Sequence, residues 1–170
     1  YDPDTRSVKL PPGYKEAART LLDAGFLSIS DDPAIGGSGM PLDVQTCCWE
    51  MFCGAGGALM LFLMLGHGAA LMIRRFGSPE QKALYVPKLL SGEWGGTMCL
   101  TEPEAGSDVG ALKTKAVPQA DGTYRITGRK CFITNGDQDI TEQIVYPVLA
   151  RIEGDPPGTK GISLFIVPKY

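Results

Sequence analysis

The sequence predicts an α+β protein, in which a helical region is followed by a run of strands, or two domains side by side. Apolar residues recur at helical spacing before Trp94, and short runs rich in β-branched residues come after it. Of 170 residues, 44% are hydrophobic and 21% are charged, which is typical of a globular protein. We place the boundary near residues 91–97, with an N-terminal helical domain at 1–94 and a β domain at 95–170.

The helical region is predicted to contain four segments. In 13–26 ("GYKEAARTLLDAGF") an apolar stripe has helical spacing, and 30–41 is a loop rich in helix breakers. Residues 42–53 and 58–76 are expected to form two buried helices joined at small residues. The fourth helix begins after Ser78 as N-cap, with Pro79 at its first position and Gln81 completing a capping box, and Pro87 should kink or end it. The stripe of the first segment consists of Ala17, Ala18, Leu21 and Leu22.

Five segments after Trp94 have the composition of strands. The sequence "ADGT" at 120–123 separates two of them and predicts a β-hairpin, and "TGRK" at 127–130 is interpreted as a bend or second turn. The segments are 95–101, 112–119, 124–134, 144–152 and 161–168.

Charge and composition exclude several classes of function. The net charge is −3, and the pairs Arg74-Arg75 and Arg129-Lys130 are too small for a nucleic-acid groove, so we interpret them as solvated surface. Residues 51–73 carry no Lys, Arg, Asp or Glu, a run long enough to suggest a membrane span. Five glycines interrupt this run, so we favour packed helices. Five cysteines without CxxC spacing indicate reduced thiols rather than a zinc site or a disulfide framework.

Other candidate motifs are weak. The glycines at 36–39 and 54–57 do not match a dinucleotide-binding pattern after a strand, and no P-loop lysine is present. His67 has no second histidine beside it, so a core histidine is favoured over a metal ligand. Cys47 and Cys48 are interpreted as packing residues because no histidine lies near them in sequence to activate them.

The stretch "MCLTEPEAGSDVG" at 98–110 is the most informative. A predicted strand ends at Thr101, and Pro103 and Gly106 should then force a turn. Backbone N–H groups in such a turn and the Ser107 hydroxyl could bind a phosphate. Its three acidic residues argue instead for a solvated acidic loop, and the residues alone leave both interpretations open.

"MCLTEPEAGSD", followed by "GRKCFITNG" at 128–136, strongly resembles the acyl-CoA dehydrogenase family. The upstream segment 77–103 also looks like this family, and 132–169 resembles its longer branch, which includes methylmercaptopropionyl-CoA dehydrogenases. The resemblance covers nearly the whole chain. It implies an N-terminal helical domain followed by an antiparallel β-barrel-like middle domain, with the family's C-terminal helical domain absent from these residues.

The resemblance also implies FAD as cofactor and an acyl-CoA as substrate. Phe132 would pack on the flavin ring and Thr134 would bond near N5. Leu100 and Thr101 would bind the pyrimidine side, while Ser107 would reach the pyrophosphate or the CoA. The acyl chain would lie along one helix. The implied cofactor residues are Met98, Leu100, Thr101, Gly106, Ser107, Phe132 and Thr134, and the implied substrate residues are Ser107, Leu61, Met64, Leu65 and Gly68.

Two departures from the family pattern affect ring stacking: Met98 stands where an aromatic is common, and Phe132 where tryptophan is common. Glu102 and Asp108 are interpreted as carboxylates that tie the turn to backbone N–H groups. Glu104 replaces a frequent glycine and should face water.

The activity implied is α,β-dehydrogenation of an acyl-CoA. The family's catalytic glutamate lies in the C-terminal domain, so we assign no catalytic residue here and expect residues 1–170 alone to be inactive. Implied partners are electron-transfer flavoprotein and further copies of the chain as a homo-oligomer, with no nucleic acid and no membrane. The expected location is cytoplasmic, or the mitochondrial matrix in a eukaryote. A DNA-associated binding protein of the same family and an acyl-CoA oxidase are the alternatives.

Overall fold

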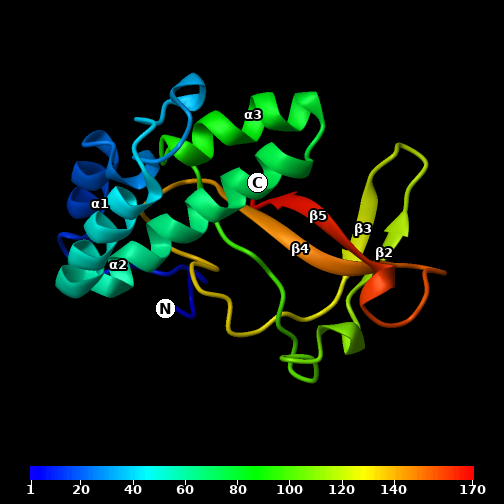
Figure 1. The fold of residues 1–170 in the computed structure, drawn as a ribbon. Coiled ribbons are helices and arrows are strands. Elements are labelled where there is room, and N and C mark those ends of the chain that lie inside the picture. Colours follow the sequence, from blue (N-terminus) through cyan, green and yellow to red (C-terminus); the bar gives the residue numbers. More distant parts are fainter. The chain divides into compact units, whose positions relative to one another are not determined.

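A computed structural model describes residues 1–170 and holds three α-helices and five strands (Figure 1). Helices followed by strands confirm the predicted α+β class. The helices are α1 (Tyr14–Asp23), α2 (Leu42–Phe76) and α3 (Pro79–Leu90). The strands are β1 (Gly95–Gly96), β2 (Lys115–Pro118), β3 (Tyr124–Thr127), β4 (Ile144–Ile152) and β5 (Ile162–Pro168).

The chain divides into two compact units, each described by itself below. The first unit comprises Tyr1–Thr97, Thr134–Val145 and Lys169–Tyr170. The second unit comprises Met98–Ile133 and Tyr146–Pro168. The units are therefore discontinuous in sequence, whereas the predicted domains are continuous.

Helix α2 forms the centre of the first unit. Its backbone leaves the helical region at Gly56 (φ −162°, ψ 63°), so two helical segments meet at small residues as predicted. The segment after the kink supplies most of the helix's buried residues, including Leu59, Leu63 and Ile73. The segment before it was predicted to be buried, and this is wrong within this chain, because of residues 42–55 only Gln45 is buried.

By length and composition alone, α2 is the one helix that could cross a membrane. A helix that packs in a protein core passes the same test. Because 39% of its most apolar window is buried inside the chain, the helix is also partly a core element.

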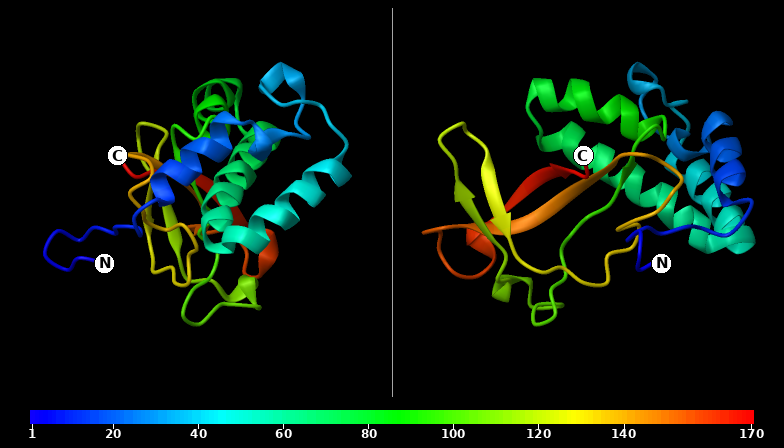
Figure 2. Two further views of the ribbon diagram at one scale, coloured as in Figure 1. Left: turned by 90° about the vertical axis from the view of Figure 1, so that its left-hand side faces the viewer. Right: turned by 180° about the vertical axis from the view of Figure 1, so that it is seen from behind.

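Helices α1 and α3 follow their sequence signals closely. Ala18 is fully buried in α1, but Ala17 is exposed and does not belong to the apolar stripe. The capping box of α3 is confirmed: the backbone N–H of Gln81 donates to Ser78 Oγ (3.2 Å), and the N–H of Ser78 donates to Gln81 Oε1 (2.8 Å). Pro87 does not end α3, which continues to Leu90; Figure 2 shows the helices from two further sides. A proline inside a helix removes one backbone hydrogen bond and crowds the carbonyl four residues earlier, yet the three residues after Pro87 remain helical.

The sheet is mixed rather than antiparallel as predicted. In the first unit, β1 pairs in parallel with the start of β4, with Gly95 opposite Ile144. In the second unit, β2 pairs in parallel with the end of β4, and β5 also pairs with β4. More than 20 residues separate β2 from β4 in the sequence, and a connection of about a dozen residues already suffices to bring two strands into parallel pairing.

The predicted hairpin is confirmed in the second unit. Strands β2 and β3 pair antiparallel, and Gly122 takes the left-handed φ of 82° in the turn between them. The side chain of Asp121 accepts hydrogen bonds from the N–H (2.9 Å) and the hydroxyl (2.6 Å) of Thr123. Strand β3 ends at Thr127, where the bend at 127–130 was predicted, so the strand segment 124–134 is interrupted there.

Candidate functional site

The second unit brings together two chain segments that carry most of the predicted cofactor residues. The backbone N–H of Cys131 donates to the carbonyl of Thr101 at 3.0 Å, which joins 98–102 to 128–132. Cys99 is buried and bonds through its backbone to Pro147 and Leu149, both in β4. Met98, Leu100 and Thr101 are each half-buried. The segment 98–102 is thus fixed from two sides, although the strand predicted at 95–101 is present only at Gly95–Gly96.

Glu102 is a buried carboxylate at the centre of this arrangement. It accepts hydrogen bonds from the backbone N–H groups of Lys113 (2.6 Å) and Thr114 (3.1 Å). The Thr114 hydroxyl and the Lys130 ammonium (2.8 Å) also donate to it. Burial by itself raises the pKa of Glu102, but hydrogen bonds from Lys130, Thr114 and Lys113 outweigh it and lower that pKa to about 2. The predicted structural role of Glu102 is therefore confirmed.

Lys130 is the residue that sequence reasoning missed. It was interpreted as solvated surface together with Arg129, yet its side chain is only 12% exposed. Its ammonium group donates to Glu102 and to the carbonyl of Leu100 (3.0 Å). Arg129 does face solvent. A lysine two residues before Phe132 gave no signal of burial, because its acidic partner lies 28 positions away.

The acidic loop closes by its own backbone. Glu102 and Ala105 exchange two backbone hydrogen bonds of 3.1 Å, with Pro103 between them. Gly106 was predicted to force the turn, but its φ is not in the left-handed region and a Cβ there would touch nothing within 4 Å. Gly106 and Ser107 are both exposed.

The other two acids of the loop face water. Glu104 forms an exposed ion pair with Lys113, as expected for a charge that must be solvated. Asp108 was predicted to tie the turn through its carboxylate, and this is wrong, because its side chain makes no capping hydrogen bond. Its backbone carbonyl instead accepts from the N–H of Ala111 at 3.2 Å.

Phe132 is the most exposed large apolar residue of the chain, with 92% of its surface open. Its φ of 55° lies in the left-handed region, where a bulky side chain is rare. Holding such a residue there costs of the order of 1–3 kcal/mol and persists only where the surroundings fix it. An exposed aromatic ring held in a strained conformation is typical of a ligand contact.

Thr134 lies in the first unit and is exposed. Its carbonyl accepts a hydrogen bond from the hydroxyl of the buried Thr97 at 2.6 Å. The next residue, Asn135, is buried with φ 59° and donates through Nδ2 to the carbonyls of Gly96 (2.9 Å) and Phe62 (3.2 Å). Thr134 is therefore held by its neighbours while its own side chain faces outward.

The predicted acyl-chain residues lie on α2 but do not share one environment. Leu61 and Gly68 are exposed and Leu65 is half-buried, and a Cβ on Gly68 would meet nothing within 4 Å. Met64 packs against the apolar core of the first unit. Leu61, Leu65 and Gly68 are spaced by four and three residues, so they lie on one helical face outside that core.

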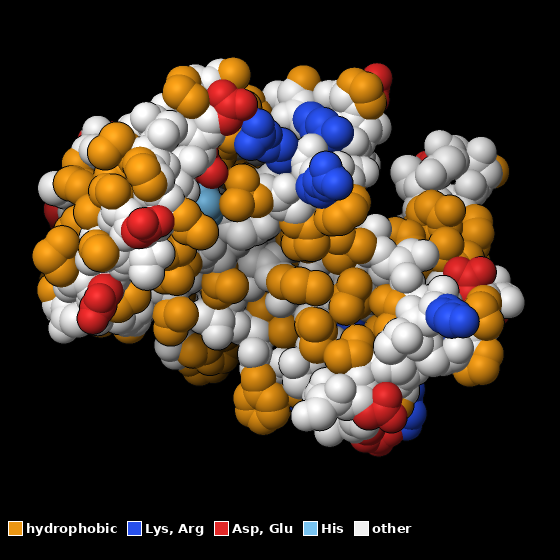
Figure 3. All heavy atoms as spheres, in the orientation of Figure 1, with side chains coloured by type: hydrophobic (Ala, Val, Ile, Leu, Met, Phe, Trp, Pro, Cys, Tyr) orange, Lys and Arg blue, Asp and Glu red, His pale blue; other side chains and the backbone are white.

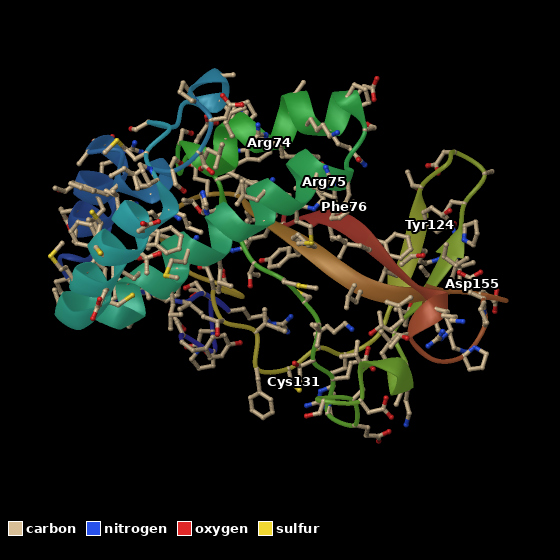
Figure 4. The ribbon with its side chains drawn as sticks, in the orientation of Figure 1. Arg74, Arg75, Phe76, Tyr124, Cys131 and Asp155 are labelled. Atoms are coloured by element: carbon tan, nitrogen blue, oxygen red, sulfur yellow. The ribbon has the colours of Figure 1, made fainter.

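The remaining candidates have structural explanations. His67 is buried and bonds through Nε2 to Asp31 Oδ2 at 2.6 Å, as expected for a core histidine. No group of three or more potential metal ligands is present in the chain, and all five cysteines are free. Cys47 is exposed, so its predicted packing role is wrong within this chain. Arg75 is exposed and Arg74 pairs with Asp32; Figure 4 labels both, and Figure 3 shows Lys and Arg side chains gathered on the same face.

A helical region followed by a mixed sheet gives the chain an α+β architecture, and the exposed Phe132 ring marks its candidate site. Two family models match the chain, the acyl-CoA dehydrogenase N-terminal domain over residues 4–93 and the middle domain over residues 97–170. The chain belongs to the acyl-CoA dehydrogenase family.

Named relatives agree with this assignment. The chain is 47% identical to the broad-specificity linear acyl-CoA dehydrogenase FadE5 of Mycobacterium tuberculosis, over 100% of its own length and 28% of that protein. It is 46% identical to 3-methylmercaptopropionyl-CoA dehydrogenase of Ruegeria pomeroyi, over 95% of the chain and 28% of that protein. The chain therefore spans little more than a quarter of the length of these relatives.

Solved structures share the fold. A probable acyl-CoA dehydrogenase from Mycobacterium abscessus superposes with a TM-score of 0.76 and 32% identity, over 95% of this chain and 41% of that one. A glutaryl-CoA dehydrogenase in complex with glutaryl-CoA gives a TM-score of 0.74 and 32% identity, over 91% of this chain and 38% of that one.

Proposed function

We propose that the full-length protein is an FAD-dependent dehydrogenase that introduces an α,β double bond into an acyl-CoA thioester. The observation that carries the proposal is Phe132, an apolar ring 92% open to solvent and held in a strained backbone conformation. Membership of the acyl-CoA dehydrogenase family suggests the reaction, and the Phe132 ring would contact the flavin.

The residues present fit a flavin. A flavin offers an apolar ring system with polar edges, and the second unit presents the Phe132 ring together with the half-buried Leu100 and Thr101. Ser107 is exposed in the adjoining loop and its hydroxyl makes no hydrogen bond within the chain, so it is free for the pyrophosphate or the CoA portion. When bound, FAD accepts the hydride that leaves the β-carbon of the substrate.

Thr134 is the proposed donor near N5. Its backbone is held by the Thr97 hydroxyl, which donates to its carbonyl, and no hydrogen bond within the chain occupies its own hydroxyl. A donor fixed in advance does not need to reorganise during the reaction, which is the property that makes such groups effective.

We propose that the protein belongs to the longer branch of the family and acts on acyl-CoA thioesters as that branch does. Relatives of which the chain covers 27–28% are 40–47% identical to it. Shorter relatives, of which it covers 36–38%, are 34–36% identical. Among these relatives, each matched over 85% or more of the chain, higher identity thus accompanies greater length. Acyl-CoA as substrate, electron-transfer flavoprotein as electron acceptor, a homo-oligomeric assembly and a cytoplasmic location are part of the same proposal.

No residue of this chain is proposed as the base that removes the α-proton. Glu102 already accepts four hydrogen bonds, and Glu104 is solvated beside Lys113. A base placed outside these residues predicts that 1–170 alone is inactive, since general-base catalysis is typically worth about 10² to 10⁴ in rate.

Absorbance of the purified full-length protein between about 350 and 500 nm tests the cofactor, and its bleaching by acyl-CoAs under anaerobic conditions tests the reaction. We expect a yellow protein that bleaches with an acyl-CoA and transfers electrons to an artificial acceptor. A colourless protein that binds no added FAD would contradict the proposal. Fast reoxidation of the reduced protein by oxygen would indicate the oxidase alternative, and specific DNA binding without turnover would indicate the DNA-associated alternative.

The acyl-chain assignment has a separate test in Gly68→Phe. A Cβ at Gly68 meets open space, so the larger ring should be tolerated by the fold and should shorten the accepted acyl chain if this face lines the substrate. Activity across a series of acyl-CoAs measures the preference. An unchanged preference in a folded protein would remove Leu61, Leu65 and Gly68 from the pocket.

A further inference from the structure

Lys130 occupies an unusual position for a lysine. Its side chain is 12% exposed, and its ammonium group faces the 5%-exposed carboxylate of Glu102 at 2.8 Å. Lysine is almost never buried unless it is paired. An ion pair of this kind often stabilises a fold no more than apolar residues of the same volume would, and fixing one specific geometry is a better-supported reason for keeping it.

The contacts of Lys130 reach both chain segments that carry the proposed flavin residues. The ammonium group donates to the carbonyl of Leu100 at 3.0 Å as well as to Glu102, so it binds both sides of Thr101. The next residue, Cys131 (Figure 4), donates its backbone N–H to the carbonyl of Thr101 at 3.0 Å. Three consecutive residues of one segment are thus bonded to two consecutive residues of the other.

Phe132 follows directly after these contacts. Its ring is exposed, so packing of the ring within the chain does not hold its left-handed φ of 55°. The bonds of the two preceding residues fix the backbone just before Phe132, and they are the contacts on this side that can hold the strained conformation.

Glu102, which pairs with Lys130, is itself fixed to the chain near β2. Glu102 receives the backbone N–H groups of Lys113 and Thr114 just before β2, and the Thr114 hydroxyl as well. Movement of Lys130 would therefore be resisted by β2 through Glu102.

We propose that Lys130 is a positioning residue, which sets the Phe132 ring and the Leu100–Thr101 edge in register for the flavin through its bonds to Glu102 and Leu100. The inference rests on the proposed function, since it concerns residues assigned there to FAD. It goes beyond that function in naming a residue that need not touch the cofactor at all.

Lys130→Met in the full-length protein removes the ammonium group and keeps most of the apolar stem. The matched control is Lys113→Met, which removes the exposed lysine paired with Glu104 but leaves its backbone N–H bonded to Glu102. For each, the apoprotein is titrated with FAD to obtain Kd, the visible circular dichroism of the bound flavin is recorded, and thermal unfolding of the apoprotein is measured.

We expect Lys130→Met to raise the Kd for FAD about tenfold, equivalent to about 1.4 kcal/mol. The visible circular dichroism of the flavin should change in shape, since this signal reports the ring's surroundings and a loss of stability elsewhere would leave it unchanged. Lys113→Met should match the unaltered protein in both measurements.

A Kd and a flavin spectrum equal to those of the unaltered protein would overturn the inference, even if the unfolding temperature fell. If Lys130→Met does not fold, Glu102→Gln decides, because it keeps the shape of the acceptor and removes its charge. An unchanged Kd and spectrum in Glu102→Gln would then overturn the inference, and an altered spectrum would support it. Failure of the unaltered protein to bind FAD would instead refute the proposed function.

Discussion

Each compact unit buries one carboxylate, and the two are held very differently. In the first unit, Asp31 is 8% exposed and its side chain bonds to a single partner, His67. In the second unit, Glu102 is 6% exposed and its side chain accepts from four donors on three residues. The difference lies in how many parts of the chain depend on one charge.

Asp31 fixes one loop to one helix. That loop has a second attachment nearby, where Gln45 accepts from the backbone N–H (3.1 Å) and hydroxyl (2.6 Å) of Ser30. Glu102 joins the segment 98–102 to the start of β2 and to the segment before Phe132, and no second buried carboxylate lies in this unit. We therefore expect the first unit to tolerate loss of the Asp31 charge better than the second unit tolerates loss of the Glu102 charge.

Glu102→Ala should therefore give the largest effect. It leaves the Lys130 ammonium without its carboxylate and two backbone N–H groups without acceptors. Breaking a buried pair in this way typically costs about 3–5 kcal/mol. Denaturant unfolding of the full-length protein measures the loss, and a change below about 1 kcal/mol, typical of an ordinary hydrogen bond, would show that water replaces the carboxylate easily.

Acid should weaken the same cluster over a defined range. The pKa of Glu102 is lowered from its ordinary 4.5 to about 2, so its contribution is complete above pH 4.5 and is lost as the pH falls toward 2. A shift of about 2.5 units corresponds to about 3 kcal/mol. The free energy of unfolding measured from pH 6 down to pH 2 should fall more steeply for the unaltered protein than for Glu102→Gln, and parallel curves would contradict this.

The sequence predicted the elements whose signals are local. The capping box at Ser78, the 120–123 hairpin and the break in α2 depend on residues within a few positions of one another, and all three are present. Sheet direction was predicted wrongly because β1 and β2 both pair with β4, which follows them only after a long connection. Periodicity within a strand carries no information on the direction of a partner that far away.

The candidate site shows the same limit. Motifs located the loop at 98–110 and the segment at 128–136, and assigned Glu102 a structural role. They did not reveal that Lys130 is the partner of Glu102, because a buried lysine and a solvated one look alike in sequence. Gly106 and Asp108 were given roles from their residue types, yet the turn closes through the backbone of Glu102 and Ala105.

Asp31→Asn should have a smaller effect than the loss of Glu102. The amide oxygen of asparagine can still accept from His67, and the Gln45 contacts remain. We expect a loss of about 1 kcal/mol, the usual contribution of one hydrogen bond. Unfolding by denaturant measures it, and a loss as large as that of Glu102→Ala would mean that Asp31 is also a central attachment.

Glu104→Gln should have the smallest effect on the free energy of unfolding. It tests whether burial of a carboxylate, rather than its place in this loop, decides the size of the effect. Glu104 lies two residues after Glu102 in the same loop, and it too is paired with a lysine. Its side chain is 68% exposed and that of Lys113 is 71% exposed, so water already solvates both charges. Exposed pairs of this kind contribute about 0–1 kcal/mol, and neutralising one partner should change the free energy of unfolding by less than about 0.5 kcal/mol.

The Glu104→Gln protein should also keep its affinity for FAD, since no bond of Glu104 reaches the segment before Phe132. A loss comparable to that of Glu102→Ala would mean that charge in this loop, rather than burial of one carboxylate, holds the second unit together.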